Sequence, residues 1–155
     1  MIFAKLPVCR KFPIFDNLIK SRKVIETAKY TKELRDLIDS SDNILLISHI
    51  NPDGDAIGSQ LALYEYFKAK GKSVEMISPN NLQEFLKWMH YADKINVFIK
   101  NRKECIRIIE RAKLIILIDF SQPDRLGEAE KFVMESAAKK IIIDHHLDPA
   151  DFADV

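Results

Sequence analysis

Imidazole and carboxylate side chains cluster at three places in the sequence, each directly after a short apolar run. The first cluster is HINPDGD at 49–55, the second is Asp119 alone, and the third is the triplet DHH at 144–146. These nitrogen and oxygen donors include no thiolate, which excludes a structural cysteine–zinc site and suits hard or borderline ions such as Mn²⁺ or Mg²⁺. Manganese is our first choice because histidine nitrogen is a poor ligand for magnesium.

The number of carboxylates indicates more than one ion. Carboxylates that converge without a cation repel one another and raise their own pKa values. One divalent ion relieves part of this repulsion, and two relieve more. Two ions about 3.5–4 Å apart, bridged by a carboxylate, can clamp the attacking and leaving oxygens of a phosphoryl transfer. The clusters therefore predict a metal-dependent phosphoryl-transfer site, provided that the fold brings them together.

The elements that must position these clusters alternate along the chain. Short apolar runs predict five strands, at 44–48, 74–77, 95–99, 114–118 and 141–143. Helical spacing of apolar residues predicts helices over about 21–40, 56–70, 82–89, 103–112 and 128–138. This alternation indicates an α/β fold, a three-layer α/β/α domain with a mainly parallel sheet of about five strands.

The three clusters are expected at one edge of that sheet, because each follows a strand and ligands bind at the carboxyl ends of parallel strands. We expect the carboxylates of Asp53 and Asp119 to lie within about 10 Å of each other, since they must share a metal cluster. The pattern leaves the order of the strands open.

Length and composition fit one ordinary globular domain of 155 residues, 47% hydrophobic and 30% charged. The net charge of +1 excludes an extended basic surface for nucleic acid. The longest apolar run, Leu114 to Ile118, is far below the roughly 20 residues that span a bilayer. Cys9 and Cys105 have no partner at zinc-ligand or CxxC spacing, which favours a reducing compartment. We therefore expect a cytoplasmic protein without membrane contact.

Residues 1–20 differ in pattern from the rest of the chain. They contain two prolines and lack the roughly 7–15 apolar residues of a secretory signal. We expect a poorly ordered leader, with an Arg- and Lys-rich arm that touches phosphate as the alternative, and a separate domain over 21–155.

The three clusters resemble the first three motifs of the DHH phosphoesterases. The carrying segments are SHINPDGDAIGS at 48–59, LIDFSQPDRLG at 117–127 and IIIDHH at 141–146. The bacterial oligoribonuclease and pAp phosphatase branch is the most similar in appearance. Related branches are the RecJ-like exonucleases, family II pyrophosphatases and DHH exopolyphosphatases. The resemblance covers about residues 34–152.

This resemblance implies a ligand set for two Mn²⁺ ions, with Mg²⁺ as the other possible metal. His49 and Asp53 would bind the first ion, and Asp55 and His145 would bind the second. Asp119 would bridge both ions, and it is the residue on which the implied chemistry depends most.

Further roles follow from the same resemblance. His146 would face the scissile phosphate as a donor or charge stabiliser, with Asp144 supporting the histidine pair. Ser59 could contact phosphate, or only cap its helix. Arg125 could meet substrate, or be a solvated loop charge.

The resemblance also implies parts that this sequence does not contain. The family has a fourth aspartate motif and a C-terminal substrate-binding domain, whereas the sequence stops at Val155. Asp148, Asp151 and Asp154 lie too close behind His146 to replace that motif, and we interpret them as loop acids. Residues 21–155 are thus expected to form an incomplete N-terminal DHH domain that by itself is weakly active or inactive.

The implied function is hydrolysis of short RNA or of 3′-phosphoadenosine 5′-phosphate (pAp). The alternatives are an exopolyphosphatase or pyrophosphatase of the same family, or a catalytically inert domain. A homo-oligomer is possible.

Aromatic residues between the second and third predicted strands have two interpretations. Phe85, Trp88 and Tyr91 could stack a base, but their helical spacing favours core packing. His90 is expected to pack at a helix end.

Overall fold

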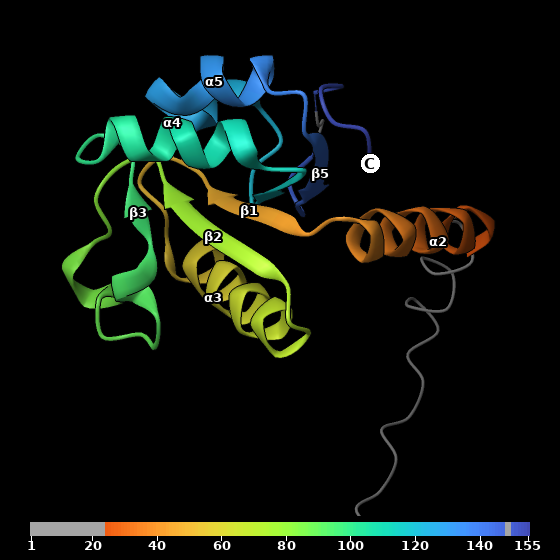
Figure 1. Cartoon of the computed structure of the whole chain (residues 1–155), viewed down its shortest axis with the longest axis horizontal. Helices are drawn as coiled ribbons and strands as arrows, with labels where there is room; N and C mark the ends of the chain where they lie inside the picture. Colours follow the sequence, from red (N-terminus) through yellow and green to blue (C-terminus); the bar gives the residue numbers. More distant parts are fainter. Residues whose placement is uncertain (1–23, 148–149) are drawn as a thin grey trace, which may run out of the picture. The chain divides into compact units, whose positions relative to one another are not determined.

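The computed structural model of the protein describes residues 24–147 and 150–155 (Figure 1). The leader predicted at 1–20 lies outside these residues. Residues 34–155 form one compact unit, and all of the candidate site residues belong to it. Helix α2 (Val24–Ser40) enters this unit at Leu34. No helix within the described ranges is long and apolar enough to cross a membrane.

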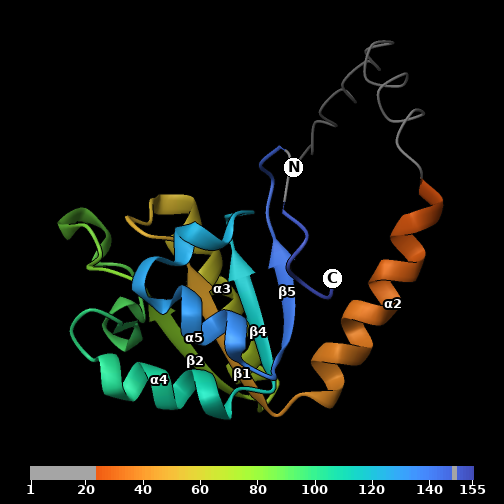
Figure 2. The same cartoon turned by 90° about the horizontal axis from the view of Figure 1, so that it is seen from above.

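Five parallel strands form one sheet in the order β3-β2-β1-β4-β5 (Figure 2). The strands are β1 (Asn43–Ser48), β2 (Ser73–Ser78), β3 (Asn96–Val97), β4 (Leu114–Ile118) and β5 (Lys139–Ile143). The central strands β1 and β4 are almost continuous runs of buried apolar residues, as expected for a parallel sheet covered on both faces.

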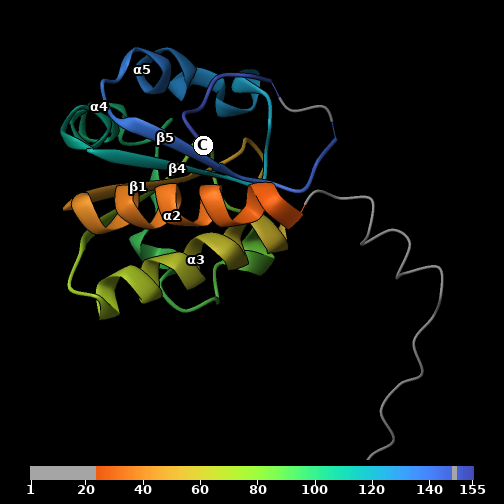
Figure 3. The ribbon, with the colours of Figure 1, turned by 90° about the vertical axis from the view of Figure 1, so that its right-hand side faces the viewer.

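Helices cover both faces of this sheet. Figure 3 shows the sheet edge-on, with α3 (Gly54–Ala69) on one side and α4 (Arg102–Arg111) and α5 (Glu130–Glu135) on the other. Alternate residues of the strands therefore enter two separate cores. Leu46 packs in the core on the α3 side, whereas Leu45 packs with Ile109 and Val133 in the other. The predicted three-layer α/β/α fold is confirmed.

Local signals explain both ends of α3. The carboxylate of Asp53 caps its first turn by accepting a hydrogen bond from the Ala56 N–H at 3.3 Å. After the last turn, Gly71 adopts φ +73°, and the Lys72 N–H closes back on the Phe67 carbonyl at 3.0 Å. The helix predicted over about 56–70 thus ends within one residue of its predicted end.

Three predicted elements are shorter than expected. Within the helix predicted at 82–89, only a 3₁₀ turn forms, at Glu84–Leu86. Phe85 and Trp88 are 62% and 82% exposed, so they supply no buried face that would stabilise a longer helix, and their predicted core packing is wrong. Tyr91 does pack against the core, edge-on to Tyr64 at 5.2 Å.

The other two differences have local causes. The strand predicted at 95–99 shrinks to β3, because the chain turns when the Asn101 N–H bonds back to the Val97 carbonyl. The helix predicted at 128–138 is replaced by a 3₁₀ segment (Pro123–Ala129) followed by α5. It ends early because Ser136 leaves helical geometry and its hydroxyl accepts the Ala138 N–H at 3.2 Å.

Candidate metal centre

The register of the sheet brings the three clusters together. Ser48 of β1 pairs with Ile118 of β4, and Ile118 pairs in turn with Ile143 of β5. The next residue on each strand is the first polar residue of a cluster. The three clusters are therefore neighbours at the carboxyl edge of the sheet, as predicted.

The first group of ligand-type atoms joins the ends of β1 and β4. The Nε2 atom of His49 lies 3.7 Å from an Asp53 carboxylate oxygen and 3.9 Å from Asp119 Oδ2. One donor atom from each of the three residues lies within 4.8 Å of the others. The carboxylates of Asp53 and Asp119 thus lie well inside the expected 10 Å.

The tautomer of His49 suits a metal ligand. Its Nδ1 lies 2.7 Å from the Ile50 carbonyl oxygen, which can only accept, so Nδ1 carries the proton. The lone pair of Nε2 is then directed at the two carboxylates, and a backbone partner on the other nitrogen is typical of metal-binding histidines. The guanidinium of Arg125 lies 3.1 Å from the same Nδ1. The Arg125 N–H and a protonated Nδ1 are both donors and cannot bond to each other. We therefore assign the proton to Nδ1 from its shorter contact with the Ile50 carbonyl.

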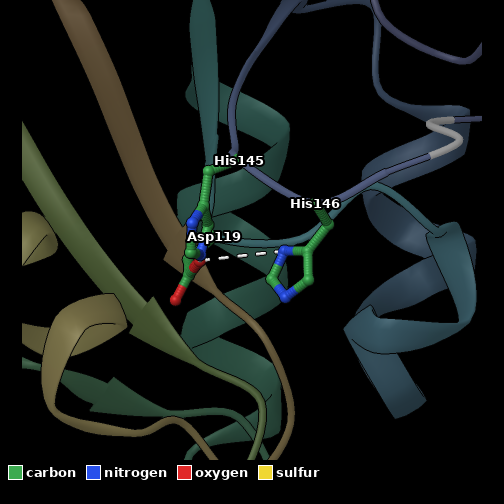
Figure 4. Close-up of side chains that lie close together, drawn as sticks. All are labelled: Asp119, His145 and His146. Atoms are coloured by element: carbon green, nitrogen blue, oxygen red, sulfur yellow. Dashed lines mark ion pairs between the residues drawn. The ribbon is translucent and has the colours of Figure 1, made fainter. Parts of the chain in front are cut away.

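The second group joins the ends of β4 and β5. Figure 4 shows His145 and His146 directed toward Asp119. Asp119 Oδ1 lies 3.2 Å from His145 Nε2 and 3.9 Å from His146 Nδ1. The two oxygens of Asp119 therefore face different groups, Oδ2 toward His49 and Oδ1 toward the histidine pair. A carboxylate in this position can be shared by two ions.

His146 has a partner that the other histidines lack. Its Nδ1 lies 2.6 Å from Asp144 Oδ1, and its backbone N–H bonds to the other Asp144 oxygen at 3.2 Å. Although burial alone would raise the pKa of Asp144, hydrogen bonds and charge from His146 hold that pKa below the usual range. The same hydrogen bond, with the Asp144 charge, raises the pKa of His146. The pair therefore favours a protonated His146, which can donate but cannot ligate through Nδ1.

Asp119 is a buried carboxylate near two other carboxylates, and a bound cation would reduce the repulsion between them. Desolvation raises the pKa of its carboxyl, and the negative charges of Asp55 and Asp53 raise it further. Its backbone also has φ +65°, in the left-handed region that glycine, asparagine and aspartate adopt more readily than most residues. A buried carboxylate crowded by two others, with imidazoles beside it, fits a site for divalent ions.

A cavity of about 300 Å³ opens beside Asp119. Its lining residues are Asp55, Ser59, Ile118, Asp119, Ile143, Asp144 and His145. Asp55 is absent from both groups of ligand-type atoms found among the described residues, but shares the cavity wall with His145. Ser59 lies one helical turn after Asp55 on α3. Arg125 is not among the described residues that line the cavity, and instead contacts the back of the His49 ring.

Three contacts that support the site were not predicted. The Ile50 N–H bonds to the Arg125 carbonyl at 2.8 Å, and the Asn51 N–H bonds to Asn80 Oδ1 at 2.7 Å. Gly127 passes so close to Ile50 that a Cβ would lie 2.8 Å from a methyl carbon. These contacts join loops that are far apart in sequence. The sequence signal that could have predicted one of them is Gly127, because glycine is common where two backbone segments approach closely.

Comparisons with known proteins agree with this geometry. A family model described as "DHH family, N-terminal domain" matches residues 43–155. The bifunctional oligoribonuclease and PAP phosphatase NrnA of Thermus thermophilus is 30% identical over 107 residues, which cover 66% of this chain and 28% of that protein. The cyclic-di-AMP phosphodiesterase PdeA of Listeria monocytogenes is 23% identical over 141 residues, or 88% of this chain and 21% of that protein.

A solved structure shares the fold. The crystal structure of an exopolyphosphatase-related protein from Bacteroides fragilis matches with a TM-score of 0.82 and 36% identity, over 86% of this chain and 39% of that chain. This chain thus spans well under half the length of each of these relatives. The predicted resemblance is confirmed, and the chain belongs to the DHH family of phosphoesterases, with residues 43–155 matching its N-terminal domain.

Proposed function

We propose that this chain is the metal-binding domain of a phosphoesterase that hydrolyses short oligoribonucleotides or pAp with two divalent ions, Mn²⁺ being the first choice. The observation that carries the proposal is the position of Asp119, whose two oxygens face two different groups of ligand-type atoms. The names of two relatives, both bifunctional oligoribonucleases and PAP phosphatases at 30% identity, support the substrate class.

The residues divide by role. His49 and Asp53 would hold one ion, His145 and Asp55 the other, and Asp119 both. When bound, such ions lower the pKa of water and neutralise the charge of a phosphate.

The groups around the ligands would act on the substrate. The Asp144 carboxylate lies 2.6 Å from His146 Nδ1 and raises the pKa of the imidazole, and the protonated ring would donate a hydrogen bond from Nε2 to a phosphate oxygen. The Ser59 hydroxyl, on the wall of the same cavity, would donate a second one. Arg125 would help to position the His49 loop, because its backbone carbonyl accepts the Ile50 N–H at 2.8 Å.

An exopolyphosphatase is the second candidate. The solved structure at 36% identity is titled as exopolyphosphatase-related. The same metal-binding residues would serve a phosphoanhydride, so the two candidates differ in whether the substrate carries a base.

The purified chain, in excess over substrate, is expected to release phosphate from pAp or mononucleotides from short RNA in the presence of Mn²⁺. Chelation should abolish this release. His146→Ala should leave Mn²⁺ affinity within a few-fold of the wild type and slow hydrolysis about 100-fold, as loss of a proton donor does. His90→Ala, a histidine outside the site, is the matched control.

Three results would count against this assignment. Metal-dependent release from polyphosphate alone would favour the second candidate. Absence of Mn²⁺ binding together with release from no phosphate substrate would contradict the assignment as a metal-dependent phosphoesterase. Equal loss of Mn²⁺ binding in His146→Ala and Asp119→Ala would contradict the role of His146.

A further inference from the structure

We propose that Phe85 and Trp88 form a stacking site for the nucleobase of the substrate, a proposal that rests on the nucleotide phosphoesterase function above and specifies its substrate class. Both aromatic side chains are largely exposed, at 62% and 82%. Exposed aromatic rings beside a phosphate site are the usual means by which proteins hold bases without reading their sequence.

The two rings lie on residues 79–95, which we call the aromatic segment, and hydrogen bonds connect this segment to the metal centre. The aromatic segment follows β2, whose last residue, Ser78, lies at the carboxyl edge of the sheet. Two residues later, the side chain of Asn80 accepts the Asn51 N–H at 2.7 Å and donates to the Asn51 side chain. Asn51 lies between His49 and Asp53 in the first cluster. The aromatic segment is thus hydrogen-bonded to the loop that supplies the first group of ligand-type atoms.

Buried neighbours hold the two rings in place. Leu86, between Phe85 and Trp88, is 4% exposed and packs beside Gly54 on the first turn of α3. Met89 follows Trp88 and lies beside Gly58, one turn further along the same helix. The exposed rings are therefore presented by an anchored backbone, and stacking on them costs little conformational entropy.

The same two turns of α3 face both the cavity and the aromatic segment. Gly54 and Gly58 contact the segment, whereas Asp55 and Ser59, each one residue further on, line the cavity beside Asp119. Successive helical residues point about 100° apart, so these are adjacent faces of one helix end. A phosphate in the cavity would therefore leave its nucleoside beside the end of α3 that contacts the segment with Phe85 and Trp88.

The charges of the segment favour a neutral, flat ligand over a second phosphate. Lys87, between the two aromatic residues, forms an ion pair with Glu84. Lys94 lies 3.3 Å from the carboxylate of Asp93. The two lysines of this stretch are thus paired with acids, and its large exposed apolar side chains are Phe85 and Trp88. A base matches that surface, whereas a polyphosphate chain does not.

The test uses the intrinsic fluorescence of the protein, because Trp88 is its only tryptophan. With Mn²⁺ present, AMP is expected to quench Trp88 emission saturably, whereas inorganic pyrophosphate is not. Phe85→Ala should raise the apparent Kd for AMP about tenfold, the order of one lost stacking partner. Tyr66→Ala removes an exposed ring from the opposite half of α3 and should leave the Kd unchanged.

Two measurements separate this proposal from the proposed function. Adenosine, which has no phosphate, should quench Trp88 in wild type and in Asp119→Asn alike, because stacking needs no metal. Quenching by adenosine in a chain that neither binds Mn²⁺ nor hydrolyses any substrate would support the stacking site and contradict the function. Hydrolysis of pAp with no quenching, and with an unchanged KM in Phe85→Ala, would overturn the stacking site alone.

A second copy of the chain is the competing occupant. If it covers these rings, sedimentation will show a dimer that Trp88→Ala converts to monomer, and Trp88 emission will change with protein concentration but not with AMP. That result would also overturn the proposal.

Discussion

Asp119→Asn is expected to stabilise the metal-free domain and, at the same time, to abolish its stabilisation by Mn²⁺. Burial and the charges of Asp55 and Asp53 raise the pKa of the Asp119 carboxyl, so the ionised group is held at a cost. Asparagine removes the charge with almost no change in shape, and it tolerates the φ of +65° well. We expect a gain of about 1 kcal/mol in the free energy of unfolding, or roughly 2–4 °C in Tm.

The gain should depend on pH in a defined direction. A carboxyl whose pKa is raised in the folded state favours folding when protonated, and this contribution is lost as the pH rises through the raised pKa. The advantage of asparagine is therefore largest at a pH above the raised pKa, and it shrinks as the pH falls through that pKa toward the ordinary value of 3.8.

With Mn²⁺ present, the wild type should become more stable than Asp119→Asn. At a Mn²⁺ concentration of 100 times Kd, the wild type should gain about 2.7 kcal/mol, whereas Asp119→Asn should gain almost nothing because both groups lose a shared ligand. Loss of a residue that only supports a ligand costs about 10–100-fold in metal affinity, and loss of Asp119 should exceed that. Thermal unfolding with and without Mn²⁺ measures both effects.

Asp93→Asn, which removes an exposed carboxylate next to Lys94, is the control and should change neither quantity. If Mn²⁺ stabilised Asp119→Asn as much as the wild type, Asp119 would not be the shared ligand.

Gly127→Ala is expected to destabilise the domain by about 2–5 kcal/mol. Gly127 has φ +54° and ψ −132°, a conformation nearly restricted to glycine, for which a side chain costs about 1–3 kcal/mol. A Cβ would also lie 2.8 Å from a methyl carbon of Ile50, and such overpacking adds about 1–3 kcal/mol. Since the Ile50 carbonyl holds His49 Nδ1, Mn²⁺ affinity should fall with stability.

Gly71→Ala is the matched control, because Gly71 also has positive φ but has no atom within 4 Å of the added Cβ. It should cost only about 1 kcal/mol and leave Mn²⁺ affinity unchanged. Urea unfolding and Mn²⁺ titration of both variants test the comparison. Equal losses of stability would mean that the approach to Ile50 imposes no strain.

Strands β1, β2 and β4 were predictable because each is a short run of mostly apolar residues buried in the sheet, whereas β3 and β5 are less buried. The predicted run at 114–118 matches β4. The run at 44–48 begins one residue after β1 begins, and the run at 74–77 is one residue shorter than β2 at each end. The segment at 79–95 was not predictable in the same way. Apolar residues at helical spacing look alike whether they are buried, as Leu86 is, or exposed, as Trp88 is.

The three clusters of the site could be located from sequence because each follows a strand directly. Their arrangement within the site depends on contacts between distant loops. The position of Arg125 behind His49 and the pairing of Asn51 with Asn80 arise only after the sheet has formed. No local pattern in the sequence specifies such contacts.

The most direct test of the metal centre is a crystal structure of the chain with Mn²⁺, in which anomalous scattering locates the ions. We expect two ions, one held by His49, Asp53 and Asp119 and the other by His145, Asp55 and Asp119. An absence of ions at the carboxyl edge of the sheet, or ions that do not contact Asp119, would contradict the account.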